Sequence, residues 1–145
     1  MTFTDPDNVV RVRYPSEWTA TKTSTDKANA LSLFGSNNEV VIFIEIYPPG
    51  SETIDQNFKR ICDGGATDEK TALVYDPVRD TQVAGQTAKS MAYRYYAAGK
   101  PSVQIGTVTI WIVDHNGKRY EFSCSNIDLH RPEIEAFMNS VAFLK

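Results

Sequence analysis

Residues 123–130, which read SCSNIDLH, bring together the side chains of a hydrolytic site within a very short segment. Ser123, Asp128 and His130 could serve as nucleophile, orienting acid and general base. A catalytic triad is defined by its geometry in space, however, so closeness along the chain is weak support for one. The sequence also lacks the Gly-x-Ser-x-Gly turn that exposes a nucleophilic serine. We therefore expect no enzymatic activity, and a hydrolase at these three residues remains an alternative.

Histidine and cysteine are too scattered to predict a metal centre. The two histidines, His115 and His130, lack the close spacing of a zinc motif. Cys62 and Cys124 lack Cys-x-x-Cys spacing, so we interpret them as two buried thiols, with one disulfide between them as the alternative. Neither Gly-x-Gly-x-x-Gly nor the Walker pattern occurs. We expect no metal and no cofactor.

Aromatic residues gather around one arginine in two neighbouring strands of the expected sheet. Tyr93, Arg94 and Tyr96 lie in one strand, and Trp111 lies in the next. Alternation places Tyr93 on one face of its strand, and Arg94 and Tyr96 on the other. Aromatic residues favour strands, so core packing is their ordinary role. A half-open aromatic groove beside an arginine also has the anatomy of a ligand site. These four residues are our candidate binding site for a ligand or protein partner.

Alternating apolar and polar residues predict the strands that must position this site. Residues 40–47 are nearly all apolar, which predicts a central strand covered on both faces. Residues 103–126 predict a hairpin around Asn116-Gly117, a pair typical of a type I′ turn. The other expected strands are 9–14, 19–24, 28–34, 72–76, 80–84 and 86–96.

Two helices are predicted from apolar stripes with helical spacing. The first covers residues 53–65, with Thr53 or Ser51 as its cap and Gly64-Gly65 at its end. The second begins at Pro132, a favoured first position, and a short strand is expected after it at 142–144. Because most connections between strands are short, the sheet should be mainly antiparallel, with helices packed on its faces. The expected fold class is α+β, in a single domain over residues 1–145.

Composition and charge restrict the partners. Fifteen basic and 18 acidic side chains are mixed along the 145 residues and give a formal net charge of −3. A clustered basic patch is missing, so we expect no nucleic-acid binding. No apolar run approaches the length of about 18 residues that a membrane-spanning helix needs. The first thirty residues lack the apolar core of a signal peptide. Both a cytoplasmic protein and an exported one whose leader is absent from this chain fit these observations.

The chain resembles the PsbP-like superfamily, which includes the photosystem II subunit P and shares its fold with the Ran-binding Mog and DcrB-like proteins. The resemblance rests on three motifs in order along the chain. Residues 14–18 read Tyr-Pro-Ser-Glu-Trp, residues 83–88 read Val-Ala-Gly-Gln-Thr-Ala, and residues 140–143 read Ser-Val-Ala-Phe. It implies an α/β/α sandwich. It also implies a Tyr-Pro turn that ends a first edge strand, with Trp18 folded back to seal one end of the core.

The resemblance implies a non-catalytic binding or assembly module, with a protein partner or a small ligand. Many bacterial members are exported or lipid-anchored. Export is therefore expected, together with peripheral membrane attachment through an N-terminal anchor that is not part of this chain. The alternative from the residues themselves is a small-ligand carrier that uses the aromatic face around Tyr93, Arg94, Tyr96 and Trp111.

Overall fold

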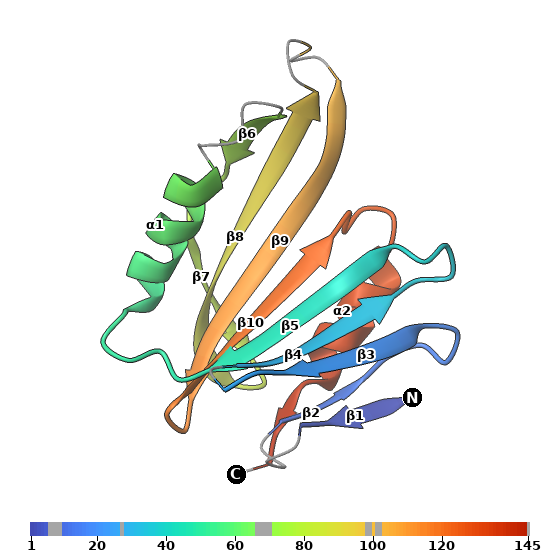
Figure 1. Cartoon of the computed structure of the whole chain (residues 1–145), viewed down its shortest axis with the longest axis vertical. Coiled ribbons are helices and arrows are strands. Elements are labelled where there is room, and N and C mark those ends of the chain that lie inside the picture. Colours follow the sequence, from blue (N-terminus) through green and yellow to red (C-terminus); the bar gives the residue numbers. More distant parts are fainter. Residues whose placement is uncertain (6–9, 27, 66–70, 98–99, 101–102, 145) are drawn as a thin grey trace.

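The computed structural model describes the chain except for residues 6–9, 27, 66–70, 98–99, 101–102 and 145 (Figure 1). The strands are β1 (Thr2–Thr4), β2 (Val10–Arg13), β3 (Thr19–Ser24), β4 (Asn29–Phe34), β5 (Val40–Tyr47), β6 (Thr71–Tyr75), β7 (Arg79–Val83), β8 (Gln86–Ala97), β9 (Gln104–His115), β10 (Lys118–Ser125) and β11 (Ala142–Phe143). The helices are α1 (Ile54–Gly65) and α2 (Arg131–Ser140).

Two antiparallel sheets make up the fold. The larger sheet has eight strands in the order β3-β4-β5-β10-β9-β8-β6, and β7 pairs with β8 beside β6. The smaller sheet has the order β1-β2-β11. The α+β class with a mainly antiparallel sheet is therefore confirmed.

Local sequence explains the main turn and the start of α1. Asn116 and Gly117 have φ angles of 53° and 77°, the left-handed pair that a type I′ hairpin requires between β9 and β10. At α1 the Thr53 hydroxyl accepts from the Gln56 amide at 3.1 Å, and the Gln56 side chain accepts from the Thr53 amide at 2.8 Å. This reciprocal capping box confirms Thr53 as the cap.

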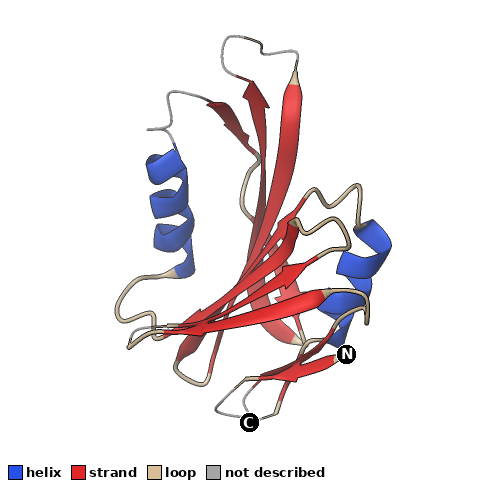
Figure 2. Ribbon diagram, turned by 45° about the vertical axis from the view of Figure 1, so that its right-hand side comes forward, coloured by secondary structure: helices blue, strands red, loops and turns tan. Residues whose placement is uncertain are grey.

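The core lies on both faces of the large sheet, because successive apolar side chains of its central strands point to opposite faces. On β10, Tyr120 and Phe122 point into the larger core cluster, which also contains Phe137 of α2. On β9, Ile110 and Ile112 point the other way, into a smaller cluster with Phe58 of α1. The two helices thus lie on opposite sides of the strands (Figure 2).

Two expectations need correction, one strand was missed, and one expectation is not confirmed. β2 is not an edge strand, because it pairs with β1 on one side and β11 on the other. β1 was not predicted, since three residues are too few to show alternation. β5 is fully buried on one face only: Ile42 is buried, whereas its neighbour Phe43 is half-buried. The three-layer sandwich is not confirmed, because α2 shares its face with the small sheet.

Trp18 occupies the place expected of it. Its amide donates to the Pro15 carbonyl at 3.1 Å, which closes the turn after β2. Its side chain is only 7% exposed and belongs to the larger core cluster, with its ring edge-on to that of His130.

Arg119 attaches α1 to the sheet. Its side chain is 1% exposed, and both carboxylate oxygens of Asp114 accept from its guanidinium at 2.8 and 2.9 Å. The same guanidinium donates to the Glu52 carbonyl at 2.8 Å, just before α1 begins. It also reaches the side chain of Asn57, a fully buried residue on α1, at 3.3 Å. One cation thus connects β9, β10 and the start of α1.

We predict that Trp18→Ala lowers the free energy of unfolding by about 3–5 kcal/mol, because it removes a large buried ring from the core. Urea denaturation measures the change. Trp18→Phe, which keeps most of the apolar contact, should lose clearly less. A loss below about 1 kcal/mol for the alanine variant would contradict the burial of Trp18.

We predict that Arg119→Ala lowers the free energy of unfolding by about 3 kcal/mol, because it leaves the buried acceptors at the start of α1 without a donor. Arg60→Ala is the matched control, since Arg60 also contacts Glu52 but its side chain is 61% exposed. It should cost about 1 kcal/mol or less. Equal losses in the two urea curves would show that Arg119 does not anchor the helix.

Candidate functional site

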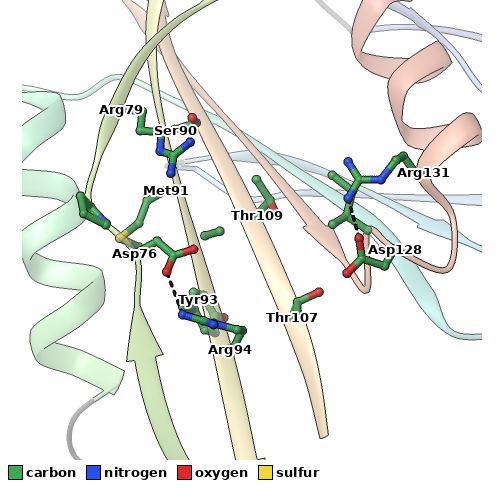
Figure 3. Close-up of a pocket in the computed structure, with 13 residues that line it drawn as sticks. Asp76, Arg79, Ser90, Met91, Tyr93, Arg94, Thr107, Thr109, Asp128 and Arg131 are labelled. Atoms are coloured by element: carbon green, nitrogen blue, oxygen red, sulfur yellow. Dashed lines mark hydrogen bonds and ion pairs between the residues drawn. The ribbon is translucent and has the colours of Figure 1, made fainter. Parts of the chain in front are cut away.

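A groove of about 430 Å³ lies beside Arg94, on the face of the large sheet that carries α2. We call it the Arg94 groove (Figure 3). It is lined by Asp76, Pro77, Arg79, Ser90, Met91, Ala92, Tyr93, Arg94, Thr107, Thr109, Ile127, Asp128 and Arg131. The lining comes from β7, β8, β9, the start of α2 and the connections that precede β7 and α2.

Strand register builds the floor of the groove from small side chains. Ala92 of β8 stands opposite Thr109 of β9, and Arg94 stands opposite Thr107. Directly paired residues of antiparallel strands share a face, so these four side chains project on the same side. Short side chains at Ala92, Thr107 and Thr109 leave the space above the strands open.

Charged pairs form two sides of the groove. On one side, Arg94 Nη2 donates to Asp76 Oδ1 at 2.9 Å, and the Asp76 amide donates to the Ala92 carbonyl at 2.8 Å. On the other side, Arg131 at the start of α2 pairs with Asp128 (Figure 3). Arg79 stands opposite Ser90 in the β7–β8 register, which places it on the same face of the sheet.

The four predicted site residues do not form one site. Arg94 and Tyr93 both border the groove, but only the Arg94 side chain projects on the groove's face of the sheet. Tyr93 points to the other face, where it packs with Tyr75 against α1 at a ring distance of 5.4 Å, and this burial raises the pKa of its hydroxyl. Trp111 lines a neighbouring cavity of about 350 Å³ beneath α2. Tyr96 lies beyond a register shift and is not among the described residues that line the groove.

Sequence reasoning missed the charged residues that complete the groove. Asp76 and Arg79 come from one segment, and Asp128 and Arg131 come from another. The pairing of β7 with β8 and the docking of α2 bring the two segments together. Asp128 was considered only as part of a hydrolytic trio. The signal that could have drawn attention to Arg131 is its position beside Pro132 at the expected helix start.

The hydrolytic trio is not assembled among the described contacts. Asp128 pairs with Arg131, whereas His130 lies 3.2 Å from the carboxylate of Glu39. Ser123 stands opposite Ile110, which faces α1, so its hydroxyl is on the face away from the larger core and Trp18.

The structure also places the two cysteines and bears on the metal site and the membrane helix considered from the sequence. Cys62 and Cys124 are free thiols in separate regions of the core, and burial raises the pKa of Cys124 to about 12. No group of three or more His, Cys, Asp or Glu residues within the described part of the chain could hold a metal ion. No helix in that part is long and apolar enough to cross a membrane.

A second polar cluster lies under α1, on the opposite face from the groove. The Tyr47 hydroxyl lies 2.7 Å from Asn57 Oδ1 and 2.9 Å from Glu121 Oε1, and Asn57 Nδ2 donates to the same Glu121 oxygen at 2.7 Å. Burial and the Glu121 charge raise the pKa of Tyr47. Glu45 stands directly opposite Glu121, and its pKa is raised by burial first and by Glu121 second, with Arg60 opposing. This cluster ties α1 to β5 and β10 through side-chain hydrogen bonds.

Comparison with known proteins identifies the fold. No protein-family model and no curated protein matches the sequence. The solution structure of cyanobacterial PsbP (CyanoP) from Synechocystis sp. PCC 6803 superposes with a TM-score of 0.68 at 13% identity, over 99% of this chain and 91% of that one. A protein of unknown function from Pseudomonas aeruginosa superposes with a TM-score of 0.54 at 10% identity, over 97% of this chain and 94% of that one. The chain has a PsbP-like fold, as the sequence resemblance predicted.

We predict that Glu45→Gln stabilises the protein at neutral pH. A carboxyl group whose folded pKa is raised favours folding while it is protonated, and it loses that contribution as the pH rises through the folded value. The variant should therefore exceed the wild type in melting temperature at pH 7, and the gap should close as the pH falls toward about 4. Glu17→Gln, a change at an exposed position, is the control. A constant gap across the pH range would contradict the ionisation argument.

Proposed function

We propose that the protein is a non-catalytic binding module with a PsbP-like fold, and that the Arg94 groove receives its partner. The observation that carries this proposal is the groove itself: an open cavity with a floor of small side chains and charged residues along two sides. Its volume of about 430 Å³ falls in the range of about 300–1,000 Å³ for small-ligand sites. It can therefore take a small molecule or one end of a larger partner.

The chemistry of the groove favours binding over catalysis. Its described lining contains arginine, aspartate, serine and threonine, but neither histidine nor cysteine. An arginine stays protonated, so it cannot exchange protons near neutral pH. Ser90 and the two threonines have no histidine beside them among the described residues of the groove, and both aspartates there are held in ion pairs with arginines. Charged forks and hydroxyls of this kind position a ligand.

The resemblance to the PsbP-like superfamily supports a wider proposal. The module would act outside the cytoplasm, attached peripherally to a membrane, and would bind a protein partner. Nucleic acid is not a proposed partner, given the net charge of −3. Fractionation of host cells, with the protein detected by antibody, tests this placement, and recovery in the cytoplasmic fraction would contradict it.

We predict that Ala92→Trp abolishes partner binding, because the indole fills the floor of the groove. The measurement is capture of the native partner from a host extract on the immobilised protein, with the captured molecules identified by mass spectrometry. Thr21→Trp, on the exposed face of β3, is the matched control and should bind as the wild type does. Melting curves of both variants verify that they fold.

Two outcomes would overturn the proposal. Equal capture by the wild type and Ala92→Trp would place the partner elsewhere. Substrate turnover by the purified protein that a single substitution abolishes would show that the module is an enzyme. A captured small molecule, lost in Ala92→Trp but kept in Thr21→Trp, would identify a small-ligand carrier.

A further inference from the structure

We propose that the Arg94 groove binds an oxyanion group, a carboxylate or a phosphate, through the guanidinium groups of Arg79 and Arg94. The inference rests on the proposed function, since it names the chemistry of the group that this binding module recognises. It goes further by assigning the recognition to two particular side chains.

The charges of the groove favour an anion. Three arginines line it, Arg79 from β7, Arg94 from β8 and Arg131 from α2, against two aspartates, Asp76 and Asp128. The lining therefore keeps one formal positive charge, although the whole chain carries −3. Positive charge concentrated in a concave site raises the local concentration of anionic ligands.

Of the three arginines in the groove, Arg79 has no acidic partner among the described residues. Arg131 contacts Asp128 and lies 3.8 Å from Glu135, and Arg94 contacts Asp76. Among the described residues no ion pair or side-chain hydrogen bond holds Arg79, which is exposed. Its neighbour Asp80 contacts Lys89 instead, at 3.8 Å. Arg79 can therefore turn toward a ligand without breaking an existing interaction.

Arg94 has donors left over. A guanidinium carries five N–H donors, and the Asp76 contact uses one of them, at Nη2. The adjacent Nε is buried and has no acceptor among the described residues, which is a costly state for a polar group. In Arg119, by contrast, Nε and Nη2 both donate to the carboxylate of Asp114. The side chain of Arg94 is 41% exposed, so a ligand can reach its outer donors.

The floor adds neutral donors at the right place. Ser90, Thr107 and Thr109 line the same groove, and their hydroxyls can donate to oxygens that the arginines leave free. Planar guanidinium groups match carboxylate and phosphate oxygens in pairs, a geometry that a lysine cannot reproduce. The combination selects a group with several acceptor oxygens and a negative charge.

The test uses two probes on the full chain, inorganic phosphate and succinate, each titrated by isothermal calorimetry at constant ionic strength with chloride as the balancing salt. We expect one-to-one binding of at least one probe, and comparing them tells phosphate from carboxylate recognition. Arg79→Gln should weaken binding at least tenfold, about 1.4 kcal/mol. Arg94→Lys, which keeps the charge and removes the fork, should weaken it comparably.

Arg11→Gln is the control, because Arg11 is an exposed arginine on the small sheet. It should bind as the wild type does. No binding of either probe above the chloride baseline would overturn the inference, and so would equal weakening in Arg11→Gln, which would show non-specific charge attraction. Arg79→Gln removes no ion pair or side-chain hydrogen bond among the described residues, so the variant should fold as the wild type does, and a melting curve verifies this.

The two proposals fail separately. If neither probe binds but Ala92→Trp still loses the captured partner, the groove is a binding site and the oxyanion assignment is wrong. If a probe binds through Arg79 and Arg94 while Ala92→Trp captures the partner normally, the groove binds an oxyanion and the partner docks elsewhere.

Discussion

The arrangement of the fold depends on the contacts of one buried group, the guanidinium of Arg119. It donates to both carboxylate oxygens of Asp114 on β9 and to the Glu52 carbonyl just before α1, and so joins the two segments. Because a buried charge without partners is very costly, β9, β10 and the start of α1 must adopt positions that satisfy it together. The helix is thereby held over the face that carries Ile110 and Ile112. The opposite face remains available for α2 and the groove.

The groove follows from unequal lengths of neighbouring elements. β8 and β9 have twelve residues each, whereas β10 has eight, and its pairing with β9 starts only at Val108. These ends of β8 and β9 therefore extend past β10, where β6 pairs with β8 (Figure 1). α2 has ten residues and packs over Phe122 and the strands next to it, so it does not extend over Ala92 and Thr107. An uncovered stretch of strand, bordered by the start of a helix, is what forms the cavity.

Sequence patterns predicted the elements well because they are local properties. Alternation located the long strands, Asn116-Gly117 set the hairpin, and the Thr53 cap set the first helix. Of the four predicted binding residues, Tyr93 and Arg94 border the groove, and only Arg94 projects on its face of the sheet. Alternation separates the two faces of a strand, but it does not say which face a helix covers, so Tyr93 and Arg94 could not be assigned to core and groove. The approach of Arg131 to that groove depends on how α2 docks, which no short motif encodes.

Arg94 and Arg119 show how the same side chain serves different purposes. Both lie on the large sheet and both contact an aspartate, at 2.9 Å and 2.8 Å. Arg119 is 1% exposed, and its guanidinium donates to Asp114 and to the Glu52 carbonyl, so its contacts stabilise the fold itself. Arg94 is half-exposed, uses one donor on Asp76 and leaves Nε without an acceptor. Stability alone would favour completing that fork, because a buried N–H without an acceptor is costly. An incompletely used fork beside an open cavity is the arrangement that the proposed oxyanion site requires.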